Sequence, residues 1–509
     1  MIAAIASATL LGVDGRPVTV EAQVSQGLPG FTIVGLPDAA CREARDRVRA
    51  AFVSSGLTWP MRRITVNLAP SAIRKAGAGL DLAIAVGLLV ATGAVEERAT
   101  RDCAFLGELG LDGSIRSIPG VLALVDAARG AAAVCPAASV GEARLVPGRR
   151  ILGARSLTEV VDALTGRVGW PDLGDVSGDV GAALSAPGPD LSGVRGQAVA
   201  KRALEVAATG GHHVLLVGPP GAGKTMLARC LSGLLPALGA EEMLEVARVR
   251  SAAGLPVLAP EPCSRPPFRA PHHSCSPVAL LGGGSTQLRP GELSLASSGV
   301  LFLDELGEFP TSVLETLRQP LEDGSVMVTR ARASARLPAR VLLVAAANPC
   351  PCGEGTERGA CRCSAAMRDR YARRLSAPFL DRFDLLVRVD RPSPRELLDD
   401  ACTGTPTAAV AARVAAGRTH AAARGVRVNA ELPDSRLDDA APLSVDARRL
   451  VERRLATGAL SARGLARVRR VARTLADLGG AGDVVGAEHV AVALELRAAR
   501  DVLLGRMAA

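Results

Sequence analysis

Hydrophobic and polar positions divide the chain into an amino-terminal stretch of mixed elements, a middle stretch of short apolar runs, and a carboxyl-terminal stretch with helical periodicity. In the first stretch, alternating polar and apolar residues indicate half-buried strands, and longer basic or apolar runs indicate helices. The pattern predicts strands at 20–24, 31–34, 63–68 and 104–109, and helices at 40–54 and 80–91. We therefore expect a compact α+β domain over residues 1–168.

The middle stretch contains apolar runs that are too short for helices and have the length of buried strands. These runs lie at 213–217, 300–303 and 340–347, and a helix is predicted before the first of them, at 198–209. Helical patterns between the runs favour a parallel sheet with helical connections. The expected fold class is thus multidomain α/β.

Composition shifts mark the remaining boundaries. Residues 169–190 are rich in Gly, Asp, Ser and Pro and are typical of a linker. We bound the parallel-sheet core at 191–395 and a helical carboxyl-terminal region at 396–509, in which 460–478 is a basic helical stretch.

The strand at 213–217 leads into a phosphate-binding motif, Gly-x-x-x-x-Gly-Lys-Thr, followed by a helical pattern. Glycines allow consecutive backbone N–H groups to surround a phosphate, and the helix N-terminus adds partial positive charge. Lys224 is expected to reach the β- and γ-phosphates of ATP, and the Thr225 hydroxyl to bind Mg²⁺. An ordinary Gly-Pro turn is the alternative, and the flanking strand and helix disfavour it. The predicted loop comprises Gly218, Pro219, Pro220, Gly221, Ala222, Gly223, Lys224 and Thr225.

Carboxylates follow a second buried strand, since residues 300–303 end in Asp304 and Glu305. The carboxyl edge of a parallel sheet is where such folds bind ligands. Asp304 is expected to hold Mg²⁺, directly or through water, and Glu305 to polarise the attacking water. Asn348 ends a third strand and is expected to orient that water. A strand ending in a solvated Asp-Glu pair is the alternative.

Four of the 11 cysteines lie within one short segment: Cys350, Cys352, Cys361 and Cys363. Four thiolates suit tetrahedral Zn²⁺, although Cys-x-Cys is tighter than the usual Cys-x₂-Cys. Buried free thiols or a redox pair are the alternatives. The scattered cysteines are expected to be structural: Cys41, Cys103, Cys135, Cys230, Cys263, Cys275 and Cys402.

The pair His272-His273 also invites a metal interpretation. Neighbouring residues of an extended segment point to opposite faces, so hydrogen bonding that shapes a loop is the favoured interpretation.

The net charge of +9 is compatible with a polyanionic partner such as nucleic acid. The apolar start lacks a basic leader and runs into a hairpin-like turn at 12–15, and no apolar run reaches the roughly 18 residues that span a bilayer. We expect a cytoplasmic protein without a membrane partner.

Further motifs make the chain similar to the YifB/ComM family of magnesium-chelatase-like AAA+ ATPases. They are Phe-Arg-Ala-Pro-His-His-Ser at 268–274, Pro-Gly-Glu at 290–292, Leu-Arg-Gln-Pro-Leu-Glu at 317–322 and Asn-Pro-Cys-Pro-Cys-Gly at 348–353. The resemblance implies a homo-oligomeric ring, a hexamer, with insertions at 264–290 and near 327–337 and a carboxyl-terminal helical lid. It also implies that Arg382 reaches a neighbouring subunit's γ-phosphate and that Arg463, or instead Arg467 or Arg470, acts as a second sensor.

The amino-terminal motifs at 35–38, 64–70 and 107–113 resemble the same family, whose first domain is related to the Lon protease (S5-type) domain. This likeness raises a rival hypothesis, a Ser–Lys peptidase. Gly77 stands where Lon has its serine and Leu122 where Lon has its lysine. Without nucleophile and base there is no covalent catalysis, so we expect a scaffold or a module that binds a protein partner.

Three hypotheses remain for what the ATPase ring acts on. The ComM resemblance implies a motor on branched or single-stranded DNA, acting in branch migration or as a helicase during recombination or transformation. A magnesium-chelatase-type ATPase for metal insertion and a protein-remodelling ring are the alternatives. The Lon-like domain favours the first over the second.

Overall fold

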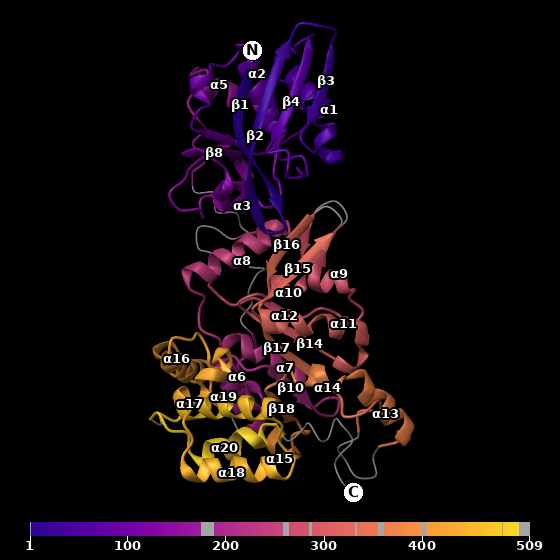
Figure 1. Ribbon diagram of the computed structural model, residues 1–509, viewed down its shortest axis with the longest axis vertical. Coiled ribbons are helices and arrows are strands. Elements are labelled where there is room, and N and C mark those ends of the chain that lie inside the picture. Colours follow the sequence, from indigo (N-terminus) through magenta and orange to yellow (C-terminus); the bar gives the residue numbers. More distant parts are fainter. Residues whose placement is uncertain are drawn as a thin grey trace.

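The computed structural model describes residues 2–174, 188–257, 264–284, 288–330, 333–354, 361–398, 404–480 and 482–497. Cys263, Cys402 and the middle of the predicted linker lie outside the described residues. A mixed sheet with its helices lies at one end of the elongated molecule, a parallel sheet in the middle, and a group of helices at the other end (Figure 1). This arrangement agrees with a multidomain α/β chain that has a helical carboxyl-terminal region.

The amino-terminal part is a seven-stranded sheet of order β3-β4-β2-β1-β5-β8-β9. Its strands are β1 (Ile2–Leu11), β2 (Asp14–Ser25), β3 (Gly30–Val34), β4 (Arg63–Ala69), β5 (Cys103–Phe105), β8 (Ala132–Pro136) and β9 (Arg150–Ala154). Its helices are α1 (Ala39–Ser54), α2 (Asp81–Ala91), α3 (Val121–Ala127), α4 (Val140–Ala143) and α5 (Leu157–Leu164). Every residue of α2 is buried, which explains why that helix is apolar on all faces.

One predicted strand differs from the structure. The predicted strand at 104–109 is divided into β5 and the short β6 (Glu108–Leu109), which pairs with β7 (Ile115–Arg116). Gly107 causes the break, because it has a φ of +158° and its N–H donates to the Gly79 carbonyl at 3.0 Å. A side chain on Gly107 would also meet Ile115 at 2.8 Å.

The core sheet is five-stranded and parallel, with the order β11-β14-β17-β10-β18. Its strands are β10 (Val214–Val217), β11 (Phe268–Arg269), β14 (Val300–Leu303), β17 (Leu342–Ala347) and β18 (Leu385–Arg388). All residues of β10, β14 and β17 are buried, as expected for strands covered on both faces.

Helices and two hairpins surround this sheet. The helices are α6 (Ala198–Gly210), α7 (Lys224–Cys230), α8 (Ala240–Ala252), α9 (Pro277–Leu281), α10 (Glu292–Leu295), α11 (Thr311–Thr316), α12 (Arg318–Asp323), α13 (Ala365–Arg374), α14 (Ala377–Leu380) and α15 (Pro394–Leu398). The hairpins are β12 (Gly282–Gly283) with β13 (Arg289–Pro290), and β15 (Ser325–Arg330) with β16 (Ala333–Pro338). They fall within the two regions where the family resemblance implies insertions.

The carboxyl-terminal helices are α16 (Thr407–Ala423), α17 (Leu437–Ala440), α18 (Val445–Ala456), α19 (Ala462–Leu478) and α20 (Ala487–Glu495). The basic stretch predicted at 460–478 is therefore helical. Val468 and Val471 of α19 share one apolar cluster with Leu204 of α6 and Leu216 of β10. The helices thus pack directly on the core that carries the phosphate loop.

The β1–β2 hairpin joins the amino-terminal sheet to the core. The tip of this hairpin lies next to β16 in Figure 1. Val13 at the tip belongs to the same apolar cluster as Leu337 of β16. Gly12 has a φ of +67°, and a Cβ there would lie 2.7 Å from the Ala335 Cβ. An ion pair between Arg248 and Asp126, 2.7 Å long, joins the two parts at a second place.

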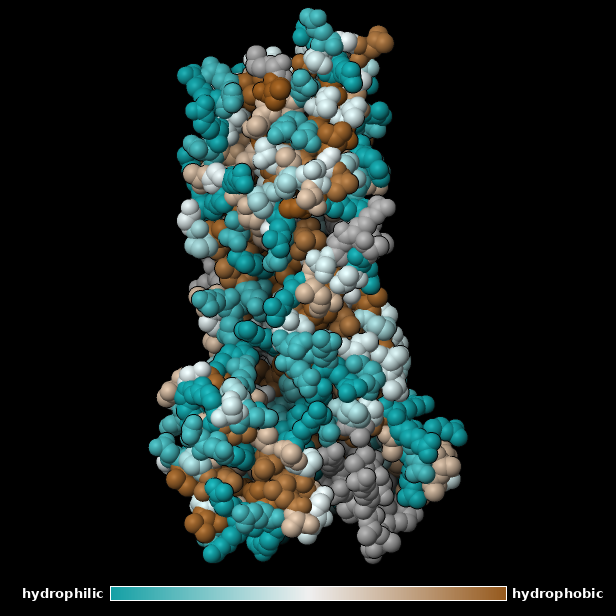
Figure 2. Space-filling view, in the orientation of Figure 1, coloured by the Kyte–Doolittle hydropathy of each residue, from teal (hydrophilic) through white to brown (hydrophobic). Residues whose placement is uncertain are grey.

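The face seen in Figure 2 is mostly hydrophilic over the core, while apolar residues gather on the amino-terminal part at the top and over the carboxyl-terminal helices. Exposed apolar residues of the amino-terminal part include Ile2, Leu28, Leu36 and Met61. Among the described helices, none combines the length and the apolar content that crossing a bilayer requires.

Candidate nucleotide site

The three strands predicted to end in functional residues lie side by side at the centre of the parallel sheet. In the register, Val217 of β10 pairs with Ala347 of β17, and Leu303 of β14 pairs with Ala345. The residues that follow these strands therefore meet at one carboxyl edge, as the sequence predicts.

The phosphate loop begins directly after β10, and its last two residues, Lys224 and Thr225, are the first two of α7. Gly218 passes so close to β18 that a Cβ would lie 1.9 Å from the Val389 carbonyl oxygen. Gly221 and Gly223 have φ values of +78° and +87°, a region that favours glycine. Close packing and backbone conformation thus explain these three glycines.

Lys224 lies across its own loop. Its Nζ donates to the carbonyls of Gly218 at 2.7 Å and Pro219 at 2.9 Å, and to Asn348 Oδ1 at 3.1 Å. Burial lowers the pKa of Lys224, and the nearby Asp304 and Glu305 carboxylates oppose that effect. The structure therefore brings the loop lysine and the predicted sensor asparagine into direct contact.

The predicted magnesium ligands also meet. Thr225 Oγ1 donates to Asp304 Oδ2 at 2.8 Å, and the Glu305 N–H donates to Asp304 Oδ1 at 3.0 Å. A hydroxyl beside a carboxylate is the oxygen donor set that Mg²⁺ takes in sites shared with a phosphate. Thr225 and Asp304 would hold the ion there.

The His272-His273 segment differs from the extended chain assumed from the sequence. The segment turns, and the two imidazole rings lie 4.0 Å apart between centroids, so they do not point to opposite faces. His272 Nδ1 lies 2.7 Å from Ser274 Oγ, which agrees with the loop-shaping interpretation. His273 Nδ1 lies 3.4 Å from Glu305 Oε2, a contact that the sequence analysis missed.

Arg382 lies at the opposite edge of the sheet, because it precedes β18 whereas Lys224 follows β10. Its guanidinium pairs with Glu322 within the same chain. Arg463 lines the same pocket as Arg382. The structure thus groups the two predicted arginines with each other and separates both from the phosphate loop of their own chain.

The two substitutes considered for Arg463 already have partners. Arg467 Nη1 lies 2.9 Å from Asp384 Oδ1, and Arg470 Nε donates to the Leu432 carbonyl at 2.8 Å. Arg463 is exposed and forms no ion pair with the described part of the chain. Of the three, its guanidinium is the least committed to its own chain.

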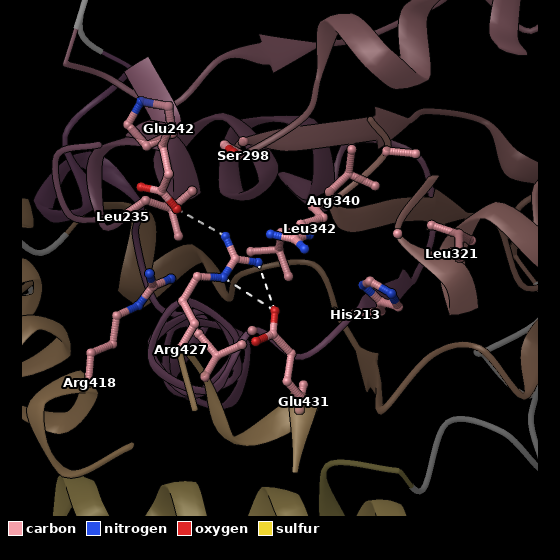
Figure 3. Close-up of a pocket in the computed structure, with 18 of the residues that line it drawn as sticks. His213, Leu235, Glu242, Ser298, Leu321, Arg340, Leu342, Arg418, Arg427 and Glu431 are labelled. Carbon is pink, nitrogen blue, oxygen red and sulfur yellow. Dashed lines mark hydrogen bonds and ion pairs between the residues drawn. The ribbon is translucent and has the colours of Figure 1, made fainter. Parts of the chain in front are cut away.

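A cavity of 620 Å³ opens at the edge of the sheet where Arg382 lies, which is the amino edge of the parallel strands (Figure 3). His213 and Arg340, which precede two core strands, line it together with residues of the carboxyl-terminal helical region. Arg427 bonds to Glu242 at 3.2 Å and to Glu431 at 3.0 Å, so its charge is already offset. No described residue of the phosphate loop lines this cavity, which is therefore distinct from the nucleotide site.

The four clustered cysteines converge as predicted. Cys350 Sγ lies 3.3 Å from Cys352 Sγ and 3.7 Å from Cys361 Sγ, and all four sulfurs, including that of Cys363, lie within 4.8 Å of one another. A disulfide needs about 2.05 Å, so these thiols are free.

The surroundings shift the pKa values of two of these thiols in opposite directions. Burial raises the pKa of Cys350 to about 12, whereas the backbone N–H of Glu354 lowers the pKa of Cys352 to about 6. The cluster adjoins the phosphate loop, since a Cβ on Gly353 would lie 2.5 Å from Pro220.

In the amino-terminal part, Lys75 is fully buried and donates to the Pro70 carbonyl. Burial lowers the pKa of Lys75. Cys41 Sγ donates to the Gly77 carbonyl at 3.0 Å, and burial raises the pKa of this thiol. The raised pKa of Cys41 disfavours the thiolate that a cysteine nucleophile requires.

Comparisons with known proteins cover nearly the whole chain. The family described as magnesium chelatase, subunit ChlI, matches residues 190–397, a second ChlI family matches 20–138, and the ChlI carboxyl-terminal family matches 404–497. An uncharacterized protein of Mycobacterium tuberculosis is 44% identical over 96% of this chain and 97% of its own length.

Two further relatives carry family names. The protein YifB of Escherichia coli is 40% identical over 97% of this chain and 96% of its own length. Competence protein ComM of Haemophilus influenzae is 40% identical over 98% of this chain and 97% of its own length. With the phosphate loop, the carboxylate strand and the cysteine loop all in place, the chain belongs to the magnesium-chelatase-like YifB/ComM family.

Proposed function

We propose that the protein is an AAA+ ATPase. The observation that carries the proposal is the meeting of Lys224, Thr225, Asp304 and Asn348 at one edge of a parallel sheet. ATP binding there would exchange the contacts between Lys224 and its own loop carbonyls for contacts to the β- and γ-phosphates. The strand order, with the loop strand β10 between β17 and β18, supports the same assignment.

Each residue has a distinct role in this proposal. The loop N–H groups and Lys224 bind and orient the phosphates, and Thr225 and Asp304 hold Mg²⁺, which supplies charge neutralisation when bound. Glu305 accepts the proton of the attacking water, and Asn348 orients that water. Both lie beside the phosphate loop, where the γ-phosphate is expected.

Arg382 and Arg463 serve the site of a neighbouring subunit in this proposal. Both lie beyond the amino edge of the sheet, opposite the edge that carries their own phosphate loop, and line one pocket. A ring, which we take to be a hexamer, would place this pocket against the carboxyl edge of the next chain. Arg382 would then exchange Glu322 for the γ-phosphate.

We propose DNA, branched or single-stranded, as the substrate on which ATP hydrolysis acts, in branch migration or as a helicase. The relative ComM is named a competence protein, and the net charge of +9 suits a polyanion. The hairpins β12–β13 and β15–β16 are the expected DNA contacts. Metal insertion of the chelatase type and protein remodelling are the competing functions.

One experiment separates the DNA motor from the two competing functions. The ATPase rate is measured alone, with single-stranded DNA, with forked DNA and with four-way DNA, at two salt concentrations. A DNA motor shows stimulation that is strongest on branched DNA and falls with salt, because phosphate contacts release counterions. Equal rates in all conditions would contradict DNA as the substrate and leave the ATPase assignment in place.

We further propose that the cysteine cluster binds one Zn²⁺. Four sulfurs around zinc at about 2.3 Å stand about 3.8 Å apart in a tetrahedron. The separations of 3.7 Å between Cys350 and Cys361 and 3.8 Å between Cys352 and Cys361 match this value.

The amino-terminal domain, which we assign as a Lon-like scaffold without peptidase activity, offers exposed apolar residues to a protein partner.

A further inference from the structure

One side chain of the histidine pair faces the carboxylate expected to act on water. His273 Nδ1 lies 3.4 Å from Glu305 Oε2. Slight tightening would make this contact a hydrogen bond, and contacts in catalytic sites are often long before substrate binds. The contact therefore connects the histidine loop, which has no role in the proposed chemistry, with Glu305, the residue expected to act on water.

The sheet brings the two residues together. Strand β11 runs parallel to β14, with Phe268 opposite Val300 and Arg269 opposite Leu301, an offset of 32 residues. Both chains then turn beyond the carboxyl ends of these strands, at 273–274 after β11 and at 304–305 after β14. His273 therefore lies beside Glu305 because both chains leave adjacent parallel strands at the same edge.

Local contacts fix the histidine loop. Arg269 binds Glu292 through two hydrogen bonds of 2.6 and 2.7 Å, which anchors β11. The Cys275 N–H donates to the His272 carbonyl at 2.9 Å and closes the turn. The His273 ring stands edge-on to buried Phe309, with 6.4 Å between centroids.

Glu305 needs such a partner. Its backbone is left-handed, with a φ of +51°, which is uncommon for a residue other than glycine. Its side chain is 60% exposed, and His273 is its ion-pair partner among the described residues. A freely rotating carboxylate would spend little time directed at the attacking water.

We propose that His273 is a positioning residue that orients the Glu305 carboxylate for hydrolysis. The inference rests on the proposed ATPase function. His273 makes no described contact with the phosphate loop, so it acts on the chemical step and leaves nucleotide affinity unchanged. It also belongs to the segment that precedes α9 and the β12–β13 hairpin.

The test compares three substitutions of one residue in the full-length protein. His273→Ala removes the contact. His273→Asn restores a nitrogen bonded to Cγ, in the place of Nδ1, whereas His273→Gln places its amide nitrogen one atom farther along. For each variant, kcat and KM for ATP, binding of a fluorescent ADP analogue and the melting temperature are measured.

We expect His273→Ala to lower kcat by about tenfold to a hundredfold, the effect of a displaced catalytic group, with ADP affinity and melting temperature unchanged. His273→Asn should recover most of the loss and His273→Gln little of it. Parental kcat in His273→Ala overturns the inference, as do equal losses in all three variants accompanied by lower melting temperatures. A parental protein that binds nucleotide without hydrolysing it overturns the proposed function itself.

Discussion

At the scale of single residues, substitutions of Lys224 and Glu305 are expected to impair different steps, nucleotide binding in the first case and hydrolysis in the second. Lys224→Ala removes the charge that faces the β- and γ-phosphates, so nucleotide affinity falls. Glu305→Gln keeps the side-chain volume and removes the base, so binding and ring assembly persist while hydrolysis falls by about 10²-fold or more. Nucleotide titration and steady-state turnover of both variants check this, and parental turnover by Glu305→Gln would refute its assignment.

The cysteine cluster gives a second prediction at this scale. Purified protein should contain one Zn²⁺ per chain by metal analysis, and Cys352→Ser combined with Cys361→Ser should lose it and melt at a lower temperature. Cys103→Ser is the matched control, because Cys103 is a partly exposed thiol outside the cluster. Metal-free protein with four alkylatable thiols in the loop would exclude zinc.

Residue-scale prediction from the sequence works where local context is sufficient. The strand, the glycine loop and the helix follow one another along the chain, so one continuous segment is sufficient to predict the Lys224 site. The contact between His273 and Glu305 cannot be predicted in this way, because it depends on which strands are neighbours in the sheet. The extended conformation expected of the two adjacent histidines is wrong, because the chain turns after Pro271.

At the scale of elements, the β1–β2 hairpin should hold the amino-terminal domain on the β15–β16 hairpin. Gly12→Ala would place a methyl group 2.7 Å from Ala335, which the packed interface cannot accept without shifting. Gly56→Ala is a close control, because Gly56 has a nearly identical φ of +68° and open space around it. Both variants therefore carry the same backbone strain, and only the first disturbs the contact.

Hydrogen exchange measures this difference. Amides of β15 and β16 should exchange faster in Gly12→Ala than in the parental protein, and at the parental rate in Gly56→Ala. Equal exchange in the two variants would show that the hairpin does not support β15–β16.

Most elements follow from periodicity, and their contacts with one another do not. The helix at 80–91 and the strand at 63–68 agree with α2 and β4 within one residue at each end. The division of 104–109 at Gly107 depends on a hydrogen bond to Gly79, which local pattern cannot show. The docking of the β1–β2 hairpin on β16 joins positions more than 300 residues apart and was likewise not predicted.

At the scale of the whole molecule, the nucleotide site of one chain is expected to be completed by the next. The phosphate loop and the Arg382 pocket lie at opposite edges of one sheet, so a single chain cannot bring them together. Arg382→Ala and Lys224→Ala should each be nearly inactive. In mixed rings, some interfaces pair an intact loop with an intact arginine.

An arginine supplied in trans is worth about 10³ to 10⁵ in rate, so a minority of complete interfaces should raise turnover visibly above either variant alone. Arg463→Ala should complement Lys224→Ala in the same way, because Arg463 shares the pocket of Arg382. It should not complement Arg382→Ala, because in such mixed rings each chain supplies only one of the two arginines and no interface holds both. Mixing a parental chain with Lys224→Ala measures whether one inactive subunit stops a ring. If it does not, and cross-linking confirms mixed rings without recovery, then Arg382 acts within its own chain and the arginine acting in trans must be another, with those of α13 the next to test.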